Sequence, residues 1–208
     1  MIPLSTMCPN RNPIEILGNA FNERFVAVAP GRNVVPHWLP QNSNAAALVT
    51  VTNGVSFPAP LINLLQPTLY GRNCEVEWEV TLTGSTRNIC DLFLGMGYNF
   101  TGVTPPNGII IRFDSGGGTD VCGILQSNGS AFVALAMSSY SAPDNIRLRG
   151  LASVVGNRVR FQAWAANSVA PVFTLLATAS PFNPGYCIIY SDGVNAGFTL
   201  HAIRGRVW

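Results

Sequence analysis

One stretch decides the fold class of this chain: Cys74-Glu75-Val76-Glu77-Trp78-Glu79-Val80-Thr81-Leu82-Thr83. Apolar and polar residues alternate strictly along it. Because successive side chains of a β-strand point to opposite faces, a period of two predicts a strand with one face in a core and the other in water. The expected core face carries Val76, Trp78, Val80 and Leu82, and the expected wet face carries Glu75, Glu77, Glu79 and Thr81.

Similar short runs follow this stretch and are separated by turns that contain Gly, Asn or Pro. The predicted strands are Ile89–Met96, Ile109–Asp114, Val121–Gln126, Ala131–Met137, Asp144–Leu151, Arg158–Ala165, Val172–Thr178, Tyr186–Tyr190 and Phe198–Val207. No convincing helical periodicity accompanies them. We therefore predict an all-β fold in which two antiparallel sheets pack face to face as a jelly-roll sandwich.

The first third of the chain has a different character. Nine of the 15 prolines lie in residues 1–68, where hydrophobic periodicity is weak, and this disfavours helices and central strands. Phe21–Val28 and Ala46–Thr52 are candidate short strands within it. We therefore divide the chain into an irregular N-terminal arm at 1–68 and a sandwich domain at 69–208. An arm that becomes ordered on a neighbouring subunit explains such a long irregular segment most easily.

Composition excludes several classes of protein. Apolar residues make up 48% of the chain and charged residues 11%, against about 25% charged in an average soluble domain, so disorder is excluded. No run approaches the roughly 18 uninterrupted apolar residues of a membrane span, and we expect no secretory signal at Met1–Pro9. All 12 basic residues are Arg, and the net charge is +2. Five of them, Arg11, Arg24, Arg32, Arg72 and Arg87, are scattered singly, and the closer pairs lie near acids. We therefore predict neither a membrane nor a nucleic acid partner.

Sparse charge also favours a protein that lives in an assembly. Charged side chains normally keep a monomer soluble, so a surface with few of them is expected to be covered by other subunits. We therefore predict a homo-oligomer. The residues expected at its contacts are Ile14, Ile16 and Leu17 in the arm, and Arg204, Arg206 and Trp208 at the other end of the sequence.

The cysteines and acidic loops predict neither a disulfide framework nor a cofactor. The five cysteines are odd in number and form no C-x-x-C pair, which favours buried free thiols in a reducing compartment. Asp114 and Asp120 flank a Gly-rich segment whose oxygen atoms are compatible with calcium, but a hairpin turn is the favoured interpretation. We therefore expect no bound metal.

A pattern in the final third of the chain resembles a known family. It consists of Gly156–Trp164, which is a Gly-Asn turn and an alternating strand, then Ala177-Thr178-Ala179, Pro184–Gly193 and a closing strand at Phe198–Arg204. This resembles the concanavalin A-like (laminin G-like) jelly-roll domains, over about Leu69 to Trp208. Such domains occur in lectins, in laminarinase-type glycoside hydrolases, and as modules of bacteriophage tail fibres and capsid decoration proteins. The resemblance implies that the first and last strands lie side by side, with Glu75–Thr83 near Phe198–Val207.

The three glutamates of the opening stretch are the strongest indication of an enzyme. In the laminarinase-type pattern the first Glu is the nucleophile, the last is the acid/base and an Asp stands between them, whereas Glu77 occupies that middle position here. Glycoside hydrolysis by Glu75 and Glu79 is therefore the less favoured hypothesis. We expect instead that Arg204 and Arg206 relieve the repulsion between the carboxylates from a neighbouring strand. No G-x-S-x-G elbow or activated thiol is present, so we predict no enzyme.

Sugar binding requires an exposed aromatic ring with polar groups around it. Trp164 has the same strand parity as Arg158, Arg160 and Gln162, so it is expected on a polar face, although half-buried packing is the more common role of such a Trp. The predicted carbohydrate-binding residues are Trp164, Arg158, Arg160 and Tyr190.

Together these features lead to two functional hypotheses. The first is a non-enzymatic structural protein of a bacteriophage-like virion, a capsid decoration or tail-fibre receptor-binding module that is assembled in the host cytoplasm with copies of itself and other virion proteins. The alternative is a soluble carbohydrate-binding lectin. A glycan is a candidate ligand under both hypotheses.

Overall fold

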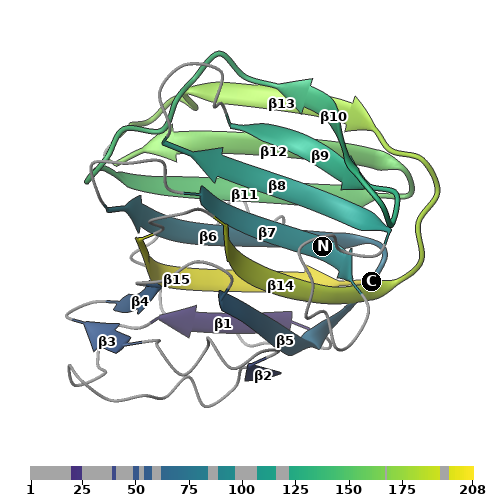
Figure 1. The fold of residues 1–208 in the computed structure, drawn as a ribbon, viewed down its shortest axis with the longest axis horizontal. Helices are drawn as coiled ribbons and strands as arrows, with labels where there is room; N and C mark the ends of the chain where they lie inside the picture. The colour runs from purple at the N-terminus through teal and green to yellow at the C-terminus, as the bar shows by residue number, and fades with distance from the viewer. Residues whose placement is uncertain are drawn as a thin grey trace.

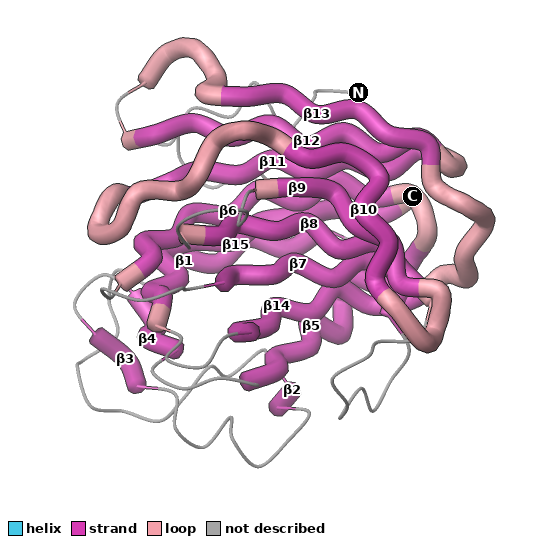
Figure 2. Tube along the Cα trace, turned by 45° about the horizontal axis from the view of Figure 1, so that its top comes forward, coloured by secondary structure: helices cyan, strands magenta, loops and turns pink. Residues whose placement is uncertain are grey.

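The computed structural model describes residues 20–24, 39–40, 49–51, 54–57, 62–83, 89–96, 107–115, 122–166, 168–192 and 197–208. Within these ranges it contains strands and connecting loops, and Figure 2 shows no helix among them. No described segment is therefore a helix long and apolar enough to cross a bilayer.

The strands form two antiparallel sheets that pack face to face (Figure 1). Sheet A has the order β13 (Phe173–Thr178), β12 (Arg158–Ala165), β11 (Arg147–Val155), β6 (Cys74–Leu82), β15 (Phe198–Val207), β4 (Gly54–Phe57) and β3 (Val49–Val51), and β1 (Ala20–Arg24) also pairs with β15. Sheet B has the order β10 (Phe132–Met137), β9 (Gly123–Ser127), β8 (Gly108–Asp114), β7 (Ile89–Met96), β14 (Gly185–Asp192), β5 (Ile62–Gly71) and β2 (Leu39–Pro40). The predicted all-β sandwich is confirmed.

Strand β6 lies near the middle of sheet A, between β11 and β15. Its apolar side chains face the other sheet and are completely buried, as the alternation predicts. The pairing of β6 with β15 places Glu77 opposite Arg204 and Glu75 opposite Arg206. The expected neighbourhood of the first and last strands of the sandwich pattern is therefore confirmed.

Aromatic packing around Trp78 joins the two sheets. The Trp78 ring lies 5.5 Å from that of Phe113 on sheet B and 5.7 Å from that of Phe161 on β12, measured between centroids. Each of these buried side chains contributes roughly 1.5–3 kcal/mol of hydrophobic stabilisation. Gly150 lies opposite Trp78 on β11, and a Cβ atom there would stand 2.6 Å from the indole. The Trp78 indole therefore fits at this position in the core only because Gly150 has no side chain.

The turn between β11 and β12 fixes the pairing of these strands. Gly156 adopts φ = 64°, a backbone conformation that glycine tolerates without strain, and Val155 pairs with Arg158 across the two-residue turn Gly156-Asn157. The register continues without a shift to Leu148 and Ala165. The predicted hairpin is therefore present, and it determines which side chains of the two strands lie side by side.

Strands from the first third of the chain belong to both sheets. β1, β3 and β4 extend sheet A, whereas β2 and β5 extend sheet B. The predicted boundary between residues 68 and 69 falls inside β5, a strand that the sequence analysis did not predict because Pro67 interrupts it. The pairing of β5 with β14 shifts register between Gln66 and Tyr70, so Pro67 lies in an irregularity where no ladder hydrogen bond is required.

The predicted buried thiols are confirmed for the four cysteines that the structure describes. Cys74, Cys90, Cys122 and Cys187 are free and buried. Burial raises the pKa of each thiol, to about 12 for Cys74 and Cys122. These side chains therefore stay protonated at neutral pH and serve as core residues.

Candidate functional site

The side of sheet A that faces away from sheet B carries a dense set of charged side chains, which we call the outer face. Alternation along four neighbouring strands places them there. The outer face consists of Arg158, Arg160, Gln162 and Trp164 on β12, Arg147, Arg149, Leu151 and Ser153 on β11, Glu75, Glu77 and Glu79 on β6, and Arg204 and Arg206 on β15.

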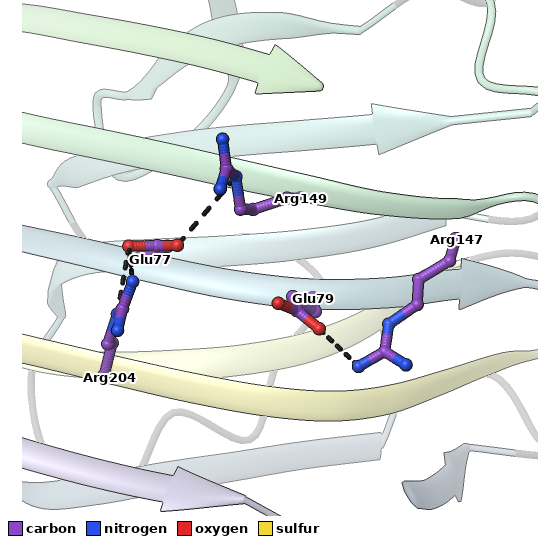
Figure 3. Close-up of polar contacts among 5 residues, drawn as sticks. All are labelled: Glu77, Glu79, Arg147, Arg149 and Arg204. Carbon is purple, nitrogen blue, oxygen red and sulfur yellow. Dashed lines mark hydrogen bonds and ion pairs between the residues drawn. The ribbon is translucent and has the colours of Figure 1, made fainter. Parts of the chain in front are cut away.

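Each carboxylate of β6 on the outer face has an arginine partner on a neighbouring strand. Figure 3 shows the partners of Glu77 and Glu79. Arg204 donates to Glu77 Oε2 from Nε at 3.0 Å and from Nη2 at 2.5 Å. Arg147 donates to Glu79. Arg206 Nη2 lies 3.4 Å from a carboxylate oxygen of Glu75. The expectation that Arg204 and Arg206 neutralise glutamates across the strands is therefore confirmed.

Glu77 is the exception to the predicted wet face. It is only 7% exposed, because Arg204 approaches it from β15 and Arg149 from β11, with Arg149 Nε 3.9 Å from Oε1. Burial raises the pKa of the Glu77 carboxyl, and the attraction of Arg204 and then of Arg149 opposes this rise without cancelling it. The prediction that Glu77 faces water is wrong, since long side chains from both neighbouring strands enclose it.

Trp164 lies on the outer face at the end of β12, where it is partly exposed. The guanidinium carbon of Arg149 stands 4.4 Å from the centroid of the Trp164 ring, within cation–π range. On the same strand, Gln162 Nε2 donates to Thr174 Oγ1 at 3.1 Å. The polar surroundings expected for Trp164 are therefore present.

Arg158 and Arg160 complete the β12 row and are both exposed. Within the part of the chain that the structure describes, neither guanidinium forms a hydrogen bond or an ion pair. Trp164, Gln162, Arg160 and Arg158 are every second residue of one strand, so neighbouring members of the row lie about 7 Å apart. The structure thus brings together three of the four predicted carbohydrate-binding residues.

Tyr190 does not join this row. It lies on β14 in sheet B, is 2% exposed, and stacks on Phe93 with 5.1 Å between ring centroids. Beside it in the register is Asp91, which accepts two hydrogen bonds from Arg112, at 2.7 and 2.8 Å. A tyrosine beside a loop is a candidate to add to an aromatic site, but its position in the sequence does not reveal to which sheet its strand belongs. We therefore exclude Tyr190 from the site.

The residues predicted at oligomer contacts are placed as follows. Arg204 and Arg206 pair with glutamates of their own chain, and the Arg206 guanidinium also lies 5.2 Å from the ring centroid of Trp208, which is 51% exposed. Ile14, Ile16 and Leu17 lie outside the described residues. Oligomer formation through any of these residues stays a prediction.

No metal centre emerges from the described residues, among which no three His, Cys, Asp or Glu side chains group as ligands. Asp114, at the end of β8, is 1% exposed. Asp120 lies outside the described residues, so the interpretation of the loop between them stays a prediction.

Arg149 is the site residue that the sequence analysis missed. A two-residue hairpin pairs residues at equal distances from its turn, and Gly156-Asn157 therefore already pairs Arg149 with Trp164. The signal was present in the turn itself. What the sequence could not reveal is that β6 lies on the other side of β11, which brings Arg149 to Glu77 as well.

Comparisons with known proteins establish the fold. No family model and no curated protein sequence matches the chain. Among solved structures, the carbohydrate binding module CBM66 from Bacillus subtilis is 16% identical with a TM-score of 0.60, and the alignment covers 82% of this chain and 96% of that one. The Ca2+/Man-bound VIP36 exoplasmic/lumenal domain is 11% identical with a TM-score of 0.67, covering 90% and 88%. The legume lectin-like domain from Entamoeba histolytica is 10% identical with a TM-score of 0.58, covering 86% and 97%.

The chain has a lectin-like sandwich fold. This agrees with the concanavalin A-like jelly roll expected from the sequence. At these identities the likeness concerns the fold alone, and the function has to be argued from the outer face.

Proposed function

We propose that this protein binds carbohydrate on the outer face of sheet A and is not an enzyme. The observation that carries this proposal is the position of Trp164, a partly exposed indole on a sheet face that is otherwise mostly polar. An aromatic ring offers an apolar surface to one side of a sugar, while neighbouring donors and acceptors orient the hydroxyl groups. CBM66, by its name, and VIP36, by its mannose-bound form, are carbohydrate-binding proteins of the same fold.

The shape of the row suits an extended ligand. From Trp164 to Arg158 it runs six residues along one strand, about 20 Å. Gln162 and Arg160 lie between these ends with amide and guanidinium donors. A chain of several linked sugars fits such a row better than a single ring does.

The state of the carboxylates supports a binding role over glycoside hydrolysis. A retaining glycosidase requires two carboxyl groups about 5–5.5 Å apart that are available to the sugar. Glu75 and Glu79 each have a guanidinium partner, and Glu77 between them is buried. A nucleophile and an acid/base on this strand would have to leave those partners before they could act.

The test is a glycan-array screen followed by titration calorimetry with the wild type, Trp164→Ala and a matched control, Trp208→Ala. Trp208 is also an exposed indole with an arginine over its ring, but it lies outside the β12 row. We expect a glycan that binds the wild type and Trp208→Ala, with affinity at least tenfold lower for Trp164→Ala, a loss of about 1.4 kcal/mol. If the wild type binds no glycan, or if both variants bind equally well, the proposal is wrong.

A second candidate is the structural role in a bacteriophage-like virion that the sequence analysis favoured. The observation in its favour is an apolar, uncharged edge: β10 and β13, which end their sheets at the same side of the sandwich, contain no charged residue. Leu176 is 71% exposed, Val133 49% and Met137 42%. Edge strands usually carry charges that prevent pairing with other chains, so this edge favours assembly with further copies.

Light scattering tests the second candidate. It predicts a defined oligomer for the wild type and a smaller particle for Leu176→Arg, which introduces a charge on the exposed side of β13. Thr178→Arg adds the same charge at the end of that strand and is the matched control. A wild-type monomer at micromolar concentration would contradict this candidate.

A further inference from the structure

The two arginines at the start of β12 have only neutral neighbours across the sheet. Arg158 lies opposite Val155 on β11 and Thr178 on β13. Arg160 lies opposite Ser153 and Leu176 in the same way. Both side chains are exposed, and in the described structure neither has a carboxylate partner. Their donors are therefore directed to solvent or to a ligand.

Charge on the outer face is unbalanced as a result. Its described side chains include six guanidinium groups, two each on β11, β12 and β15, and three carboxylates on β6, which leaves +3. The whole chain carries only +2. Because the carboxylates of β6 pair with the arginines of β11 and β15, the excess lies mainly on β12.

A third guanidinium adjoins the row at its other end. Arg149 lies over Trp164 and forms only a long ion pair with Glu77, at 3.9 Å, so no hydrogen bond to it is present among the described residues. A sugar ring in contact with Trp164 therefore meets a cation with available donors. The row thus has an aromatic ring with Arg149 at one end and two free arginines at the other.

We infer that the outer face of sheet A selects acidic oligosaccharides, whose carboxylate or sulfate groups pair with Arg158 and Arg160 while a sugar ring contacts Trp164. This inference rests on the proposed carbohydrate binding and adds the charge of the ligand to it. A guanidinium presents a planar fork of donors that matches a carboxylate or sulfate with two hydrogen bonds. Arg158 and Arg160 lie about 7 Å apart, and Arg160 lies about 13 Å from Trp164. A ligand that reaches all three requires acid groups that repeat along the sugar chain.

A basic strip with one indole also has features of a single-stranded nucleic acid site, where several aromatic rings stack on successive bases. Here Trp164 is the only aromatic residue of the β12 row, and the positions between it and Arg158 hold Gln162 and Arg160. One aromatic contact for a row of about 20 Å suits a sugar chain better than a run of bases. An oligonucleotide is nevertheless included in the test as a competitor.

The experiment compares acidic and neutral ligands with the same backbone by titration calorimetry on the full chain. The pairs are tetragalacturonate with its methyl ester, and dextran sulfate oligosaccharide with dextran; the competitor is a single-stranded oligothymidylate. We expect at least one acidic member to bind tenfold or more tightly than its neutral partner, with an affinity that falls as salt is raised. Carboxylate and sulfate are distinguished by which pair shows the difference.

Variants separate this inference from the proposed function. Arg158→Gln/Arg160→Gln should lower the ratio of acidic-ligand affinity to neutral-ligand affinity at least tenfold, because these variants remove both cations and keep amide donors in their place. Arg158→Lys/Arg160→Lys should retain part of the preference and its salt dependence. Trp164→Ala should weaken binding of all sugars. Because both arginines are exposed, unchanged unfolding curves are expected and serve as the folding control.

The outcomes that overturn the inference are distinct. Equal binding of acidic and neutral sugars overturns the acid preference and leaves carbohydrate binding intact. Tighter binding of oligothymidylate than of every acidic sugar overturns the ligand class. Absence of binding by any sugar overturns both this inference and the proposed function.

Discussion

Two pairs of arginines on the outer face differ in almost nothing except the strands beside them. Arg204 and Arg206 on β15, and Arg158 and Arg160 on β12, have the same spacing and face the same side of one sheet. β15 lies beside β6 and its glutamates, so the first pair neutralises buried or half-buried carboxylates. β12 lies between two strands whose opposing residues are neutral. The register of the sheet therefore decides whether an arginine stabilises the fold or is available to a ligand.

The largest effect that would sharpen this comparison comes from Arg204→Gln with Arg158→Gln as its matched control. Loss of Arg204 leaves the buried Glu77 carboxylate without its strongest partner, and we expect about 3 kcal/mol of lost stability at pH 7. Arg158→Gln should change stability by no more than about 0.5 kcal/mol. Urea unfolding measures the stability of both variants. Equal losses of stability would contradict the distinction between arginines that stabilise the fold and arginines that are available to a ligand.

A smaller effect is expected from Glu77→Gln, and its direction depends on pH. Because burial raises the pKa of Glu77 above its ordinary value of 4.5, the folded protein binds a proton more tightly than the unfolded chain. This tighter proton binding adds to the free energy of unfolding. The added stability is complete below pH 4.5 and is lost as pH rises through the raised pKa of Glu77. Relative to Glu77→Gln, wild-type stability should therefore fall over this range.

At neutral pH the Gln variant should therefore compare more favourably with the wild type in unfolding free energy than it does at pH 4. Unfolding free energies measured every half unit from pH 4 to 7 provide the check. A wild type that gains stability over the variant as pH rises would mean that attraction by Arg204 and Arg149 outweighs burial.

The smallest effect is expected from Glu75→Gln. The Glu75–Arg206 pair is longer, at 3.4 Å, and more exposed than the pair at Glu77. We expect a loss of less than about 1 kcal/mol that diminishes further in high salt. A loss as large as that of Arg204→Gln would indicate that all carboxylates of β6 are equally dependent on their partners.

Local patterns in the sequence predict the strands but not their neighbours. Alternation around Trp78 and the turn at Gly156 predict local structure because each depends on residues close in the chain. The burial of Glu77 depends on arginines from two strands far away in sequence, so parity alone placed it in water. Tyr190 and Pro67 also depend on how the strands pair. The pairing of β14 places Tyr190 in sheet B, and the register shift between β14 and β5 accommodates Pro67.

The position of β15 also has a consequence for the order of events during synthesis. β15 follows every other described strand in the chain, yet it lies between β6 and β4 and also pairs with β1. Glu77 and Arg204 are 127 residues apart, so a ribosome requires roughly 6–25 s to produce the second after the first. Until then β1, β3 and β4 lack their link to the rest of sheet A. The nascent chain therefore carries an open sheet edge for several seconds, and unpaired strand edges of this kind are the places where partly folded chains pair with one another.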